Sequence, residues 1–423
     1  MVKRRLVGLA MLALAGCEYL TSSFETNDFS GDAFPIHVED TSGAIVVGLE
    51  ETGATSRRVA VLDVLSPITL IDRGPDAAQS ITSLDLTILG ARTPGGDLDL
   101  PRARFLGKQT VTLHPCKARE CEVGTGIASR PFNALIGLNT FSSDALRLRL
   151  ADDQIFILPD IAGSELHRAR SCDAVLPSPF RGGGTMVIGG TELGFTNWRI
   201  AIDACIAPNP ERLRTQSARG VDALFVLSTA IGTSILNRTT YERYRQLDPT
   251  APAVEGLPEH TVLLPSGPIV GYLADLPSIA LVGNSSAARR APCRQMWASH
   301  LLAERDCELG DDCPCIGANF CQVPAVVELA PAARIPILVV PDADPTLQAL
   351  RTELRPDRPE VDGILGTAVI EALELDIDYA HDRLLARCVD RVACGARAEL
   401  PNREARSYVN GCLGDMPGPI VLH

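Results

Sequence analysis

An internal repeat constrains this chain more than any other feature of its sequence. Val61–Arg73 (VLDVLSPITLIDR) aligns without a gap with Val226–Arg238 (VLSTAIGTSILNR), and Asp63 falls opposite Ser228. In each copy an apolar stretch ends in a polar residue, continues through a segment with Ser or Thr, and enters a second apolar stretch. A unit that recurs in this way is typical of a duplicated domain.

A second motif follows each copy of the first. Ala134–Leu158 (ALIGLNTFSSDALRLRLADDQIFIL) is similar to Gly363–Ala386 (GILGTAVIEALELDIDYAHDRLLA), and Gly137 falls opposite Gly366. The two motifs are farther apart in the second half. The extra residues include a cysteine-rich segment, which we interpret as a disulfide-pinned insertion at about 285–325.

The segments between the motifs indicate short strands. They are rich in β-branched residues, alternate between apolar and polar positions, and are bounded by Gly, Pro and Asp. Because the turns are closely spaced, we expect mostly antiparallel β-structure with a few short helices.

The first residues predict export and lipidation. Lys3–Arg5 form a basic region, and Leu6–Leu14 are apolar but too few to span a bilayer. Leu14–Cys17 (LAGC) is typical of a bacterial lipobox, in which the Cys17 thiol receives the lipid. We therefore expect residues 1–16 to be a signal peptide, residues 17–34 a tether, and the acyl chains to anchor the protein to a membrane. Glu18 instead of Asp after the cysteine favours the outer membrane over the inner.

Composition limits the partners. The formal charge is −13, and removing the signal peptide makes it more negative, which argues against nucleic acid binding. The remaining roughly 400 residues can form two domains with proper cores. We expect a monomer without a cofactor.

The cysteine count indicates an oxidising compartment. There are 13 cysteines, so an even number remains once the lipidated one is set aside. The spacing in Cys307–Cys321 does not match structural zinc, and we expect no metal site. The connectivity there and at Cys412 stays open. The candidates for disulfide bonds are Cys116, Cys121, Cys172, Cys205, Cys388 and Cys394.

The repeat resembles the aspartic peptidases, in both their two-lobed pepsin-like form and the retropepsin half. In that family each lobe presents Asp-Thr-Gly after an apolar strand, and an apolar-apolar-Gly segment supports the loop. Leu135–Gly137 and Ile364–Gly366 are similar to this supporting segment. The resemblance covers most of residues 40–390 and implies two β-barrel lobes with a peptide-binding cleft between them.

The resemblance also suggests domain limits. We expect an N-terminal lobe at 35–160, an inter-lobe segment at 161–219, a C-terminal lobe at 220–392 that carries the insertion, and a tail at 393–423.

The two catalytic triplets depart from the family pattern. The first is Asp63-Val64-Leu65 and the second begins Ser228-Thr229. In the family the Thr links the two loops and the Gly allows a tight turn beside the carboxylate. The flap tyrosine of pepsin-like enzymes has no counterpart either. Asp63 is the retained catalytic candidate, Ser228 replaces the second Asp, and Ser66, Thr229, Gly137 and Gly366 are expected to support the loops.

The family mechanism requires two carboxyl groups that share one proton, one acting as base and the other as acid. A serine hydroxyl cannot take either part. We therefore predict a proteolytically inactive lipoprotein that binds a peptide or protein ligand in its cleft. Two alternatives remain: a divergent active aspartic endopeptidase, and a structural lipoprotein without a ligand.

A second register for the first motif is also open. Asp72-Arg73-Gly74 offers another Asp-x-Gly after an apolar stretch, but Asp72 aligns with Asn237 and the exit sequence favours Asp63. No histidine or lysine is placed by sequence to activate Ser228 as a nucleophile.

Overall fold

The structure is a computed structural model. It describes residues 31–390 apart from 41, 55–56, 92–97, 117–119, 126–127, 142–144, 159–173, 178–180, 189, 209–219, 284–291, 294–301, 307–319, 325, 331–333, 355–359 and 380–382. The predicted signal peptide, Cys17, Cys172, Cys394 and Cys412 lie outside the described residues.

The described residues of the first half form strands and two short 3-10 helices. These are β1 Phe34–Pro35, β2 His37–Val38, β3 Ile45–Glu51, β4 Arg57–Leu62, β5 Thr69–Asp72, β6 Ser80–Ala91, β7 Leu98–His114, β8 Glu122–Thr125, β9 Ala128–Pro131, β10 Ala134–Ile136, η2 Leu138–Phe141, β11 Ala145–Arg149, η3 Leu150–Asp152 and β12 Gln154–Leu158. Strands β13 Ala174–Pro177, β14 Arg181–Ile188 and β15 Thr191–Arg199 follow.

In the described part of the second half, the α-helices α2, α4 and α5 accompany the same kind of strand pattern. Its elements are β16 Ala201–Ala207, β17 Val221–Leu227, β18 Ser234–Asn237, α2 Arg238–Leu247, η6 Val254–Gly256, β19 Glu259–Leu264, β20 Gly267–Leu276, β21 Ser278–Val282, β22 Leu302–Asp306, β23 Phe320–Pro324, β24 Val326–Leu329, β25 Ile335–Val340, α4 Pro345–Glu353, β26 Gly363–Leu365, α5 Thr367–Ile370, β27 Leu373–Asp378 and β28 Arg383–Cys388. No helix in the described part of the chain is long and apolar enough to cross a membrane.

Two helices begin where the sequence provides a cap. The Asn237 side chain accepts the Thr240 N–H at the start of α2, and Asp344 accepts two N–H groups at the start of α4, where Pro345 follows. An Asn or Asp side chain in this position satisfies amides that the first turn of a helix leaves free.

The repeat predicted from the sequence is present in the strand register. In the first half β10 runs parallel to β4 with Ile136 opposite Leu62, and in the second half β26 runs parallel to β17 with Leu365 opposite Leu227. Strand β10 also pairs antiparallel with β5, and β26 pairs antiparallel with β18. The prediction of a mostly β, duplicated, two-lobed architecture is therefore confirmed.

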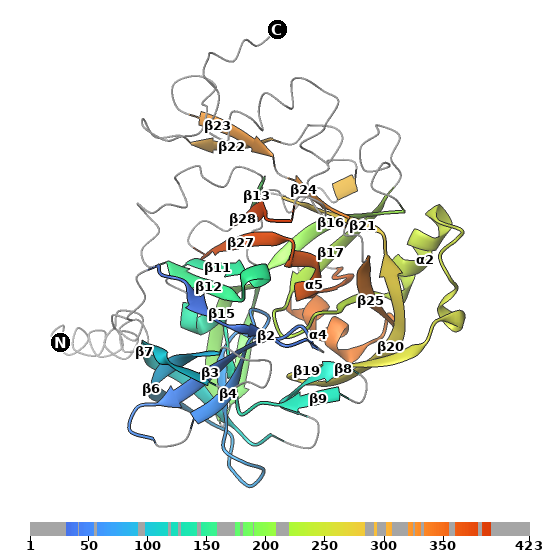
Figure 1. Cartoon of the computed structure of the whole chain (residues 1–423). Coiled ribbons are helices and arrows are strands. Elements are labelled where there is room, and N and C mark those ends of the chain that lie inside the picture. The colour runs from blue at the N-terminus through green and yellow to red at the C-terminus, as the bar shows by residue number, and fades with distance from the viewer. Residues whose placement is uncertain are drawn as a thin grey trace, which may run out of the picture.

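The two halves share a six-stranded sheet in the order β1-β12-β11-β27-β28-β13. Strands β11 and β27, which belong to equivalent hairpins of the two halves, pair antiparallel at its centre. In Figure 1 this sheet lies above the first-half strands around β3, β4, β6 and β7 and to the left of the second-half strands around β16, β17 and β25. The predicted hairpins at the ends of the two repeats thus join the lobes.

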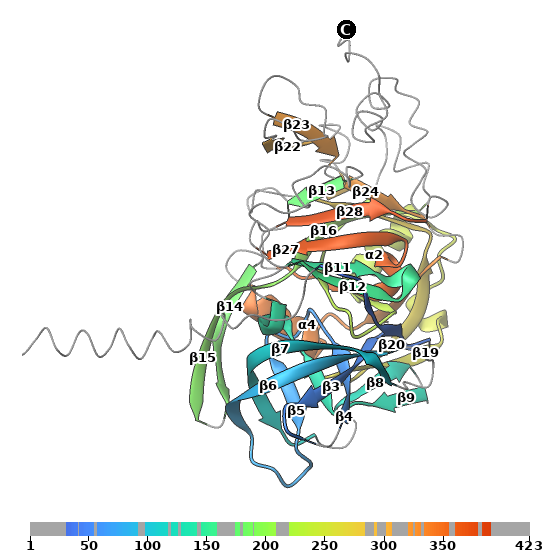
Figure 2. The same cartoon turned by 60° about the vertical axis from the view of Figure 1, so that its left-hand side comes forward.

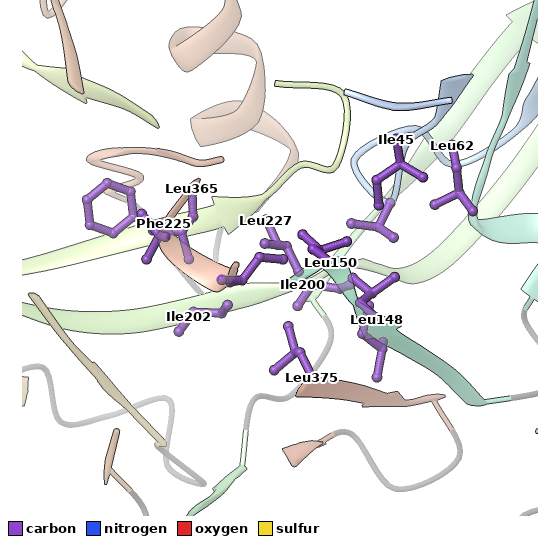
Figure 3. Packing of buried hydrophobic residues seen from close by; sticks show 14 of the residues in the cluster. Ile45, Leu62, Leu148, Leu150, Ile200, Ile202, Phe225, Leu227, Leu365 and Leu375 are labelled. Atoms are coloured by element: carbon purple, nitrogen blue, oxygen red, sulfur yellow. The ribbon is translucent and has the colours of Figure 1, made fainter. Parts of the chain in front are cut away.

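One hydrophobic cluster continues from the first half into the second. Ile45 and Leu62 of the first half, Leu148 and Leu375 of the shared sheet, and Phe225 of the second half all belong to it and are buried. Figure 3 shows these side chains following one another across the seam. Burial of this apolar surface holds the lobes against the shared sheet.

The opposite side of the shared sheet carries buried ion pairs. Arg147 on β11 forms a two-bond pair with Asp376 on β27, with distances of 2.6 and 2.9 Å, and Arg149 bonds to Glu374. The guanidinium of Arg149 also lies 5.2 Å from the centroid of the Phe156 ring. A charge buried at such a site needs its partner, so the pairing fixes how β11 and β27 align.

The lobes also meet through a second set of strands. The hairpin β8–β9 of the first half joins the edge of β19 in the second half, with Gly124 opposite Leu263 and Thr125 opposite Val262. An eleven-stranded sheet therefore runs from the second lobe into the first. The hairpin β14–β15 forms its own two-stranded sheet and projects beside the first lobe (Figure 2).

Candidate functional site

Equivalent strand ends place Asp63 and Ser228 at the seam. The Asp63 N–H donates to the carbonyl of Ile136 at 3.0 Å, and the Ser228 N–H donates to the carbonyl of Leu365 at 2.9 Å. Each polar residue thus leaves its strand where the partner strand, β10 or β26, begins its glycine turn. This is why the two motifs occur in the same order in both halves.

Gly137 and Gly366 occupy equivalent tight positions behind these loops. A Cβ at Gly137 would lie 2.5 Å from the Ile68 backbone, and one at Gly366 would lie 2.4 Å from the Gly232 carbonyl oxygen. The N–H of Gly137 donates to the Thr69 hydroxyl, and that of Gly366 donates to the equivalent Ser234 hydroxyl. Any residue with a Cβ would clash at either position, because the backbone of the neighbouring loop passes so close.

Asp63 and Ser228 are in direct contact. The Ser228 hydroxyl donates to Asp63 Oδ1 at 2.9 Å, and the backbone N–H groups of Leu65 and Thr229 donate to the same oxygen at 3.0 and 3.2 Å. Asp63 is 3% exposed and Ser228 is fully buried. The two residues that the repeat places opposite each other thus meet across the lobes.

Thr229 links the two loops. Its hydroxyl donates to the Leu62 carbonyl at 2.8 Å and accepts the Val64 N–H at 3.1 Å. Val64, the equivalent residue of the first lobe, has no hydroxyl, so only the second lobe contributes a threonine hydroxyl to the contact between the loops. Ser66 makes a local bond, from its hydroxyl to the Ile68 carbonyl at 3.0 Å.

Burial raises the pKa of Asp63. Removal from water disfavours the charged carboxylate, whereas the bonds from Leu65, Ser228 and Thr229 and the charge of Arg199 act in the opposite direction. All three hydrogen bonds use Oδ1. When the carboxyl group is neutral, its proton therefore belongs on Oδ2, where it can be donated.

A cavity of about 600 Å³ opens beside Asp63. Its walls are largely apolar, with Leu65, Leu70 and Leu135 on the first-lobe side and Leu264 and Leu350 on the second. The Leu65 side chain also packs against the hydrophobic core of the second lobe. Leu65 therefore narrows the cavity without filling it.

The hairpin β19–β20 forms one edge of this cavity. Its turn residues Pro265 and Ser266 line the cavity, and the Pro265 carbonyl accepts the Cys121 N–H at 3.5 Å. The Cys116–Cys121 disulfide closes the loop that precedes β8. The backbone edge of β19 is therefore already paired with a strand of the other lobe.

Arg199 and Glu353 are site residues that the sequence did not reveal. The Arg199 guanidinium donates to Glu353 Oε2 at 2.8 and 2.6 Å and also to the Leu65 carbonyl. It thereby ties β15, α4 and the Asp63 loop together. Arg199 lies in the segment predicted to separate the lobes, and no motif marks it, so only the tertiary structure brings it to the cavity.

The alternative register for the first motif is not at the seam. Asp72 ends β5 and accepts the N–H groups of Gly74 and Cys116 through Oδ1, at 2.9 and 3.2 Å. Asp72 therefore organises a turn, whereas Asp63 contacts the opposite lobe.

The predicted cysteines divide between bonded and undescribed positions. Cys205 on β16 bonds to Cys293, and β16 pairs antiparallel with β21, the strand that precedes Cys293 in the described part of the chain. Cys388 is also disulfide-bonded.

The chemistry available at the seam is that of a single carboxyl group. No second carboxylate bonds to Asp63 in the part of the chain described, and that part holds no group of three or more His, Cys, Asp or Glu side chains able to bind a metal. Asp63 can accept hydrogen bonds when ionised and donate one when neutral. The only carboxylate that bonds to Ser228 in the described part of the chain is Asp63 itself, and no histidine or lysine there bonds to the Ser228 hydroxyl.

No protein-family model matches the sequence, and no curated protein matches it. Solved structures with a similar fold include conglutin gamma, a basic 7S globulin from lupine seeds, at 10% identity and a TM-score of 0.42, covering 84% of this chain and 94% of that one. Basic 7S globulin from soybean gives 11% identity and a TM-score of 0.39, covering 84% and 94%. An aspartic proteinase from Irpex lacteus gives 11% and 0.37, covering 85% and 97%. At these values, the functional proposal rests on the geometry of the site.

Proposed function

We propose that this chain binds an extended peptide in the cavity beside Asp63 and does not hydrolyse it. The observation that carries the proposal is the identity of the group facing Asp63, which is the Ser228 hydroxyl and not a second carboxyl group. Hydrolysis of the aspartic type needs one carboxylate as base and a neighbouring carboxylic acid as proton donor. A hydroxyl group, whose pKa lies far above that of a carboxyl group, supplies neither.

The same geometry supports binding. The apolar walls suit hydrophobic side chains, and a few polar groups at the floor can fix the orientation of a ligand. Because burial raises the pKa of Asp63, its neutral form persists to a higher pH than that of an exposed carboxyl group. The neutral acid can donate from Oδ2 to a peptide carbonyl.

We further propose that the protein is a monomeric lipoprotein of the bacterial cell envelope, anchored through Cys17 to the outer rather than the inner membrane. The basic region, the short apolar stretch and the sequence LAGC support this proposal. Growth with a radiolabelled fatty acid tests it, because label should enter the wild type and be lost in Cys17→Ser. A variant that keeps the label would contradict lipidation at Cys17.

Binding can be tested with a variant that fills the cavity. Ala349 is exposed on α4 and lines the cavity, whereas its neighbour Gln348 is exposed and does not. We expect Ala349→Arg to abolish binding of a fluorescent octapeptide library that the wild type retains. Gln348→Arg, which adds the same side chain to the same helix, should bind as the wild type does.

Activity separates this proposal from its first alternative. The full chain should release no fragments from denatured casein between pH 3 and pH 8. Cleavage that pepstatin inhibits and that Asp63→Ala abolishes would establish an active peptidase instead. A chain that neither cleaves casein nor retains any peptide would favour a structural lipoprotein without a ligand.

A further inference from the structure

A second cavity, of about 550 Å³, lies where the two halves meet, and it shares no lining residue with the cavity at Asp63. The N–H of Gly232 donates to the Ser42 carbonyl beside it, and the Thr367 hydroxyl donates to the Gly43 carbonyl at 2.6 Å. Both lobes therefore form its walls.

The lining of this cavity is anionic. It contains the carboxyl groups of Glu39, Asp40, Asp153 and Glu371, and no Lys or Arg is among its lining residues. Glu39 accepts the Ser42 N–H, and Asp153 accepts the Val38 N–H. Asp40 and Glu371 are exposed, and their side chains have no partner among the described residues. Two carboxylates are thus free to meet a ligand.

His37 supplies an independent indication of a ligand. This residue lines the cavity and is 7% exposed, and its imidazole has no hydrogen-bond partner in the described part of the chain. Neither ring nitrogen is completely shielded from solvent. Buried polar side chains are normally hydrogen-bonded, so an imidazole that opens into a cavity without a partner is suited to contact a ligand there.

The shape of the site favours an organic cation over a metal ion. No three His, Cys, Asp or Glu side chains among the described residues are grouped closely enough to coordinate a metal. A volume of about 550 Å³ is instead in the range of small-molecule sites. Separated carboxylates and an imidazole nitrogen can accept hydrogen bonds from ammonium groups spaced along an alkyl chain.

We propose that this cavity binds an alkylammonium ligand, held by Asp40, Glu371 and His37. Such a ligand can be a free polyamine or a lysine side chain of a peptide, since both present the same group. The site is independent of peptide binding at Asp63. Because both lobes contribute to it, a bound cation links them and raises the thermal midpoint of the protein.

The test uses the purified full chain and four probes: putrescine, spermidine, a Gly-Lys-Gly peptide and calcium chloride. Calorimetry should detect binding of at least one ammonium probe with a dissociation constant below about 10 mM. Tighter binding of the polyamines would identify a free polyamine as the ligand, and tighter binding of Gly-Lys-Gly would identify a lysine side chain of a peptide. The NMR signals of the His37 ring, assigned by their loss in His37→Gln, should shift when the probe binds.

The charge of the site is tested by a matched pair of double variants. Asp40→Asn/Glu371→Gln should weaken binding about tenfold or more. Asp85→Asn/Glu259→Gln removes the same two charges from exposed positions that do not line the cavity, and should bind as the wild type does. No binding of any ammonium probe, equal weakening in both double variants, or tighter binding of calcium than of the amines would overturn the proposal.

Discussion

Replacing Asp63 by Asn should stabilise this protein at neutral pH and leave its stability at acidic pH unchanged. The carboxyl group is 3% exposed, and its three hydrogen bonds all reach Oδ1. An Asn side chain keeps that acceptor and turns its NH₂ group toward the cavity. Asp63→Asn therefore preserves the bonds and removes the cost of burying a charge.

The sign of the pH dependence follows from the raised pKa. In the unfolded chain Asp63 ionises near the ordinary carboxyl value of about 3.9. Burial raises the pKa in the folded state, so between the two values the folded protein holds a proton that the unfolded chain has lost. The free energy of unfolding then falls as pH rises, by at most about 1.4 kcal/mol per pH unit. Below both values this contribution is zero.

The assay is urea unfolding of the wild type and Asp63→Asn at intervals from pH 3 to pH 8. The difference in unfolding free energy should be flat at the acidic end, turn in favour of Asn above about pH 4, and level off above the folded-state pKa. Asp85→Asn makes the same chemical change at an exposed position and should show no such rise.

The opposite control removes the acceptor. Asp63→Ala leaves the Ser228 hydroxyl and the Thr229 N–H without it, which should cost about 1–3 kcal/mol for each unpaired group at any pH. If Asp63→Asn were instead less stable at pH 8 than the wild type, Asp63 would be ionised and stabilising in the folded protein. An advantage of Asn that did not depend on pH would mean that folding does not raise the pKa of Asp63. The account of a buried, readily protonated acid would then be wrong.

Three further variants test the seam, each measured by urea unfolding. Gly366→Ala places a Cβ against the Gly232 carbonyl and should cost about 1–3 kcal/mol; unchanged stability would mean that the loop can move aside. Thr229→Val should cost about 1–3 kcal/mol for each backbone group that the lost hydroxyl leaves unpaired, while Thr229→Ser recovers most of it. Arg147→Met leaves Asp376 buried without its partner and should cost about 3–5 kcal/mol. Because the pKa of Asp376 is already raised by burial and loses the lowering effect of Arg147, that cost should be larger at pH 8 than at pH 5, and an equal loss at both would contradict it.

Much of the architecture was predictable because the duplication is visible as two copies of short local sequence motifs. In each copy an apolar strand ends in Asp63 or Ser228, and an apolar-apolar-Gly segment ends in Gly137 or Gly366. These segments specify the turns that follow them. Two copies in the same order then predict the contact between Asp63 and Ser228, which the structure shows at 2.9 Å.

Other features depend on pairings between distant segments that share no local signal. Arg199 lies in a stretch without a motif, yet it reaches Glu353 on α4 and the Leu65 carbonyl. Cys205 bonds to Cys293 because of how β16 and β21 pair, and cysteine spacing alone could not select that partner.

The sequence by itself determined that two similar β units follow one another and that the second has Ser228 where the first has Asp63, because strand pattern and residue identity are local properties. The tertiary structure alone decided that burial raises the pKa of Asp63, which side chains line its cavity, and that β8 pairs with the edge of β19. Those properties depend on burial and on contacts between residues far apart in the chain, and both arise only when the two lobes pack against each other.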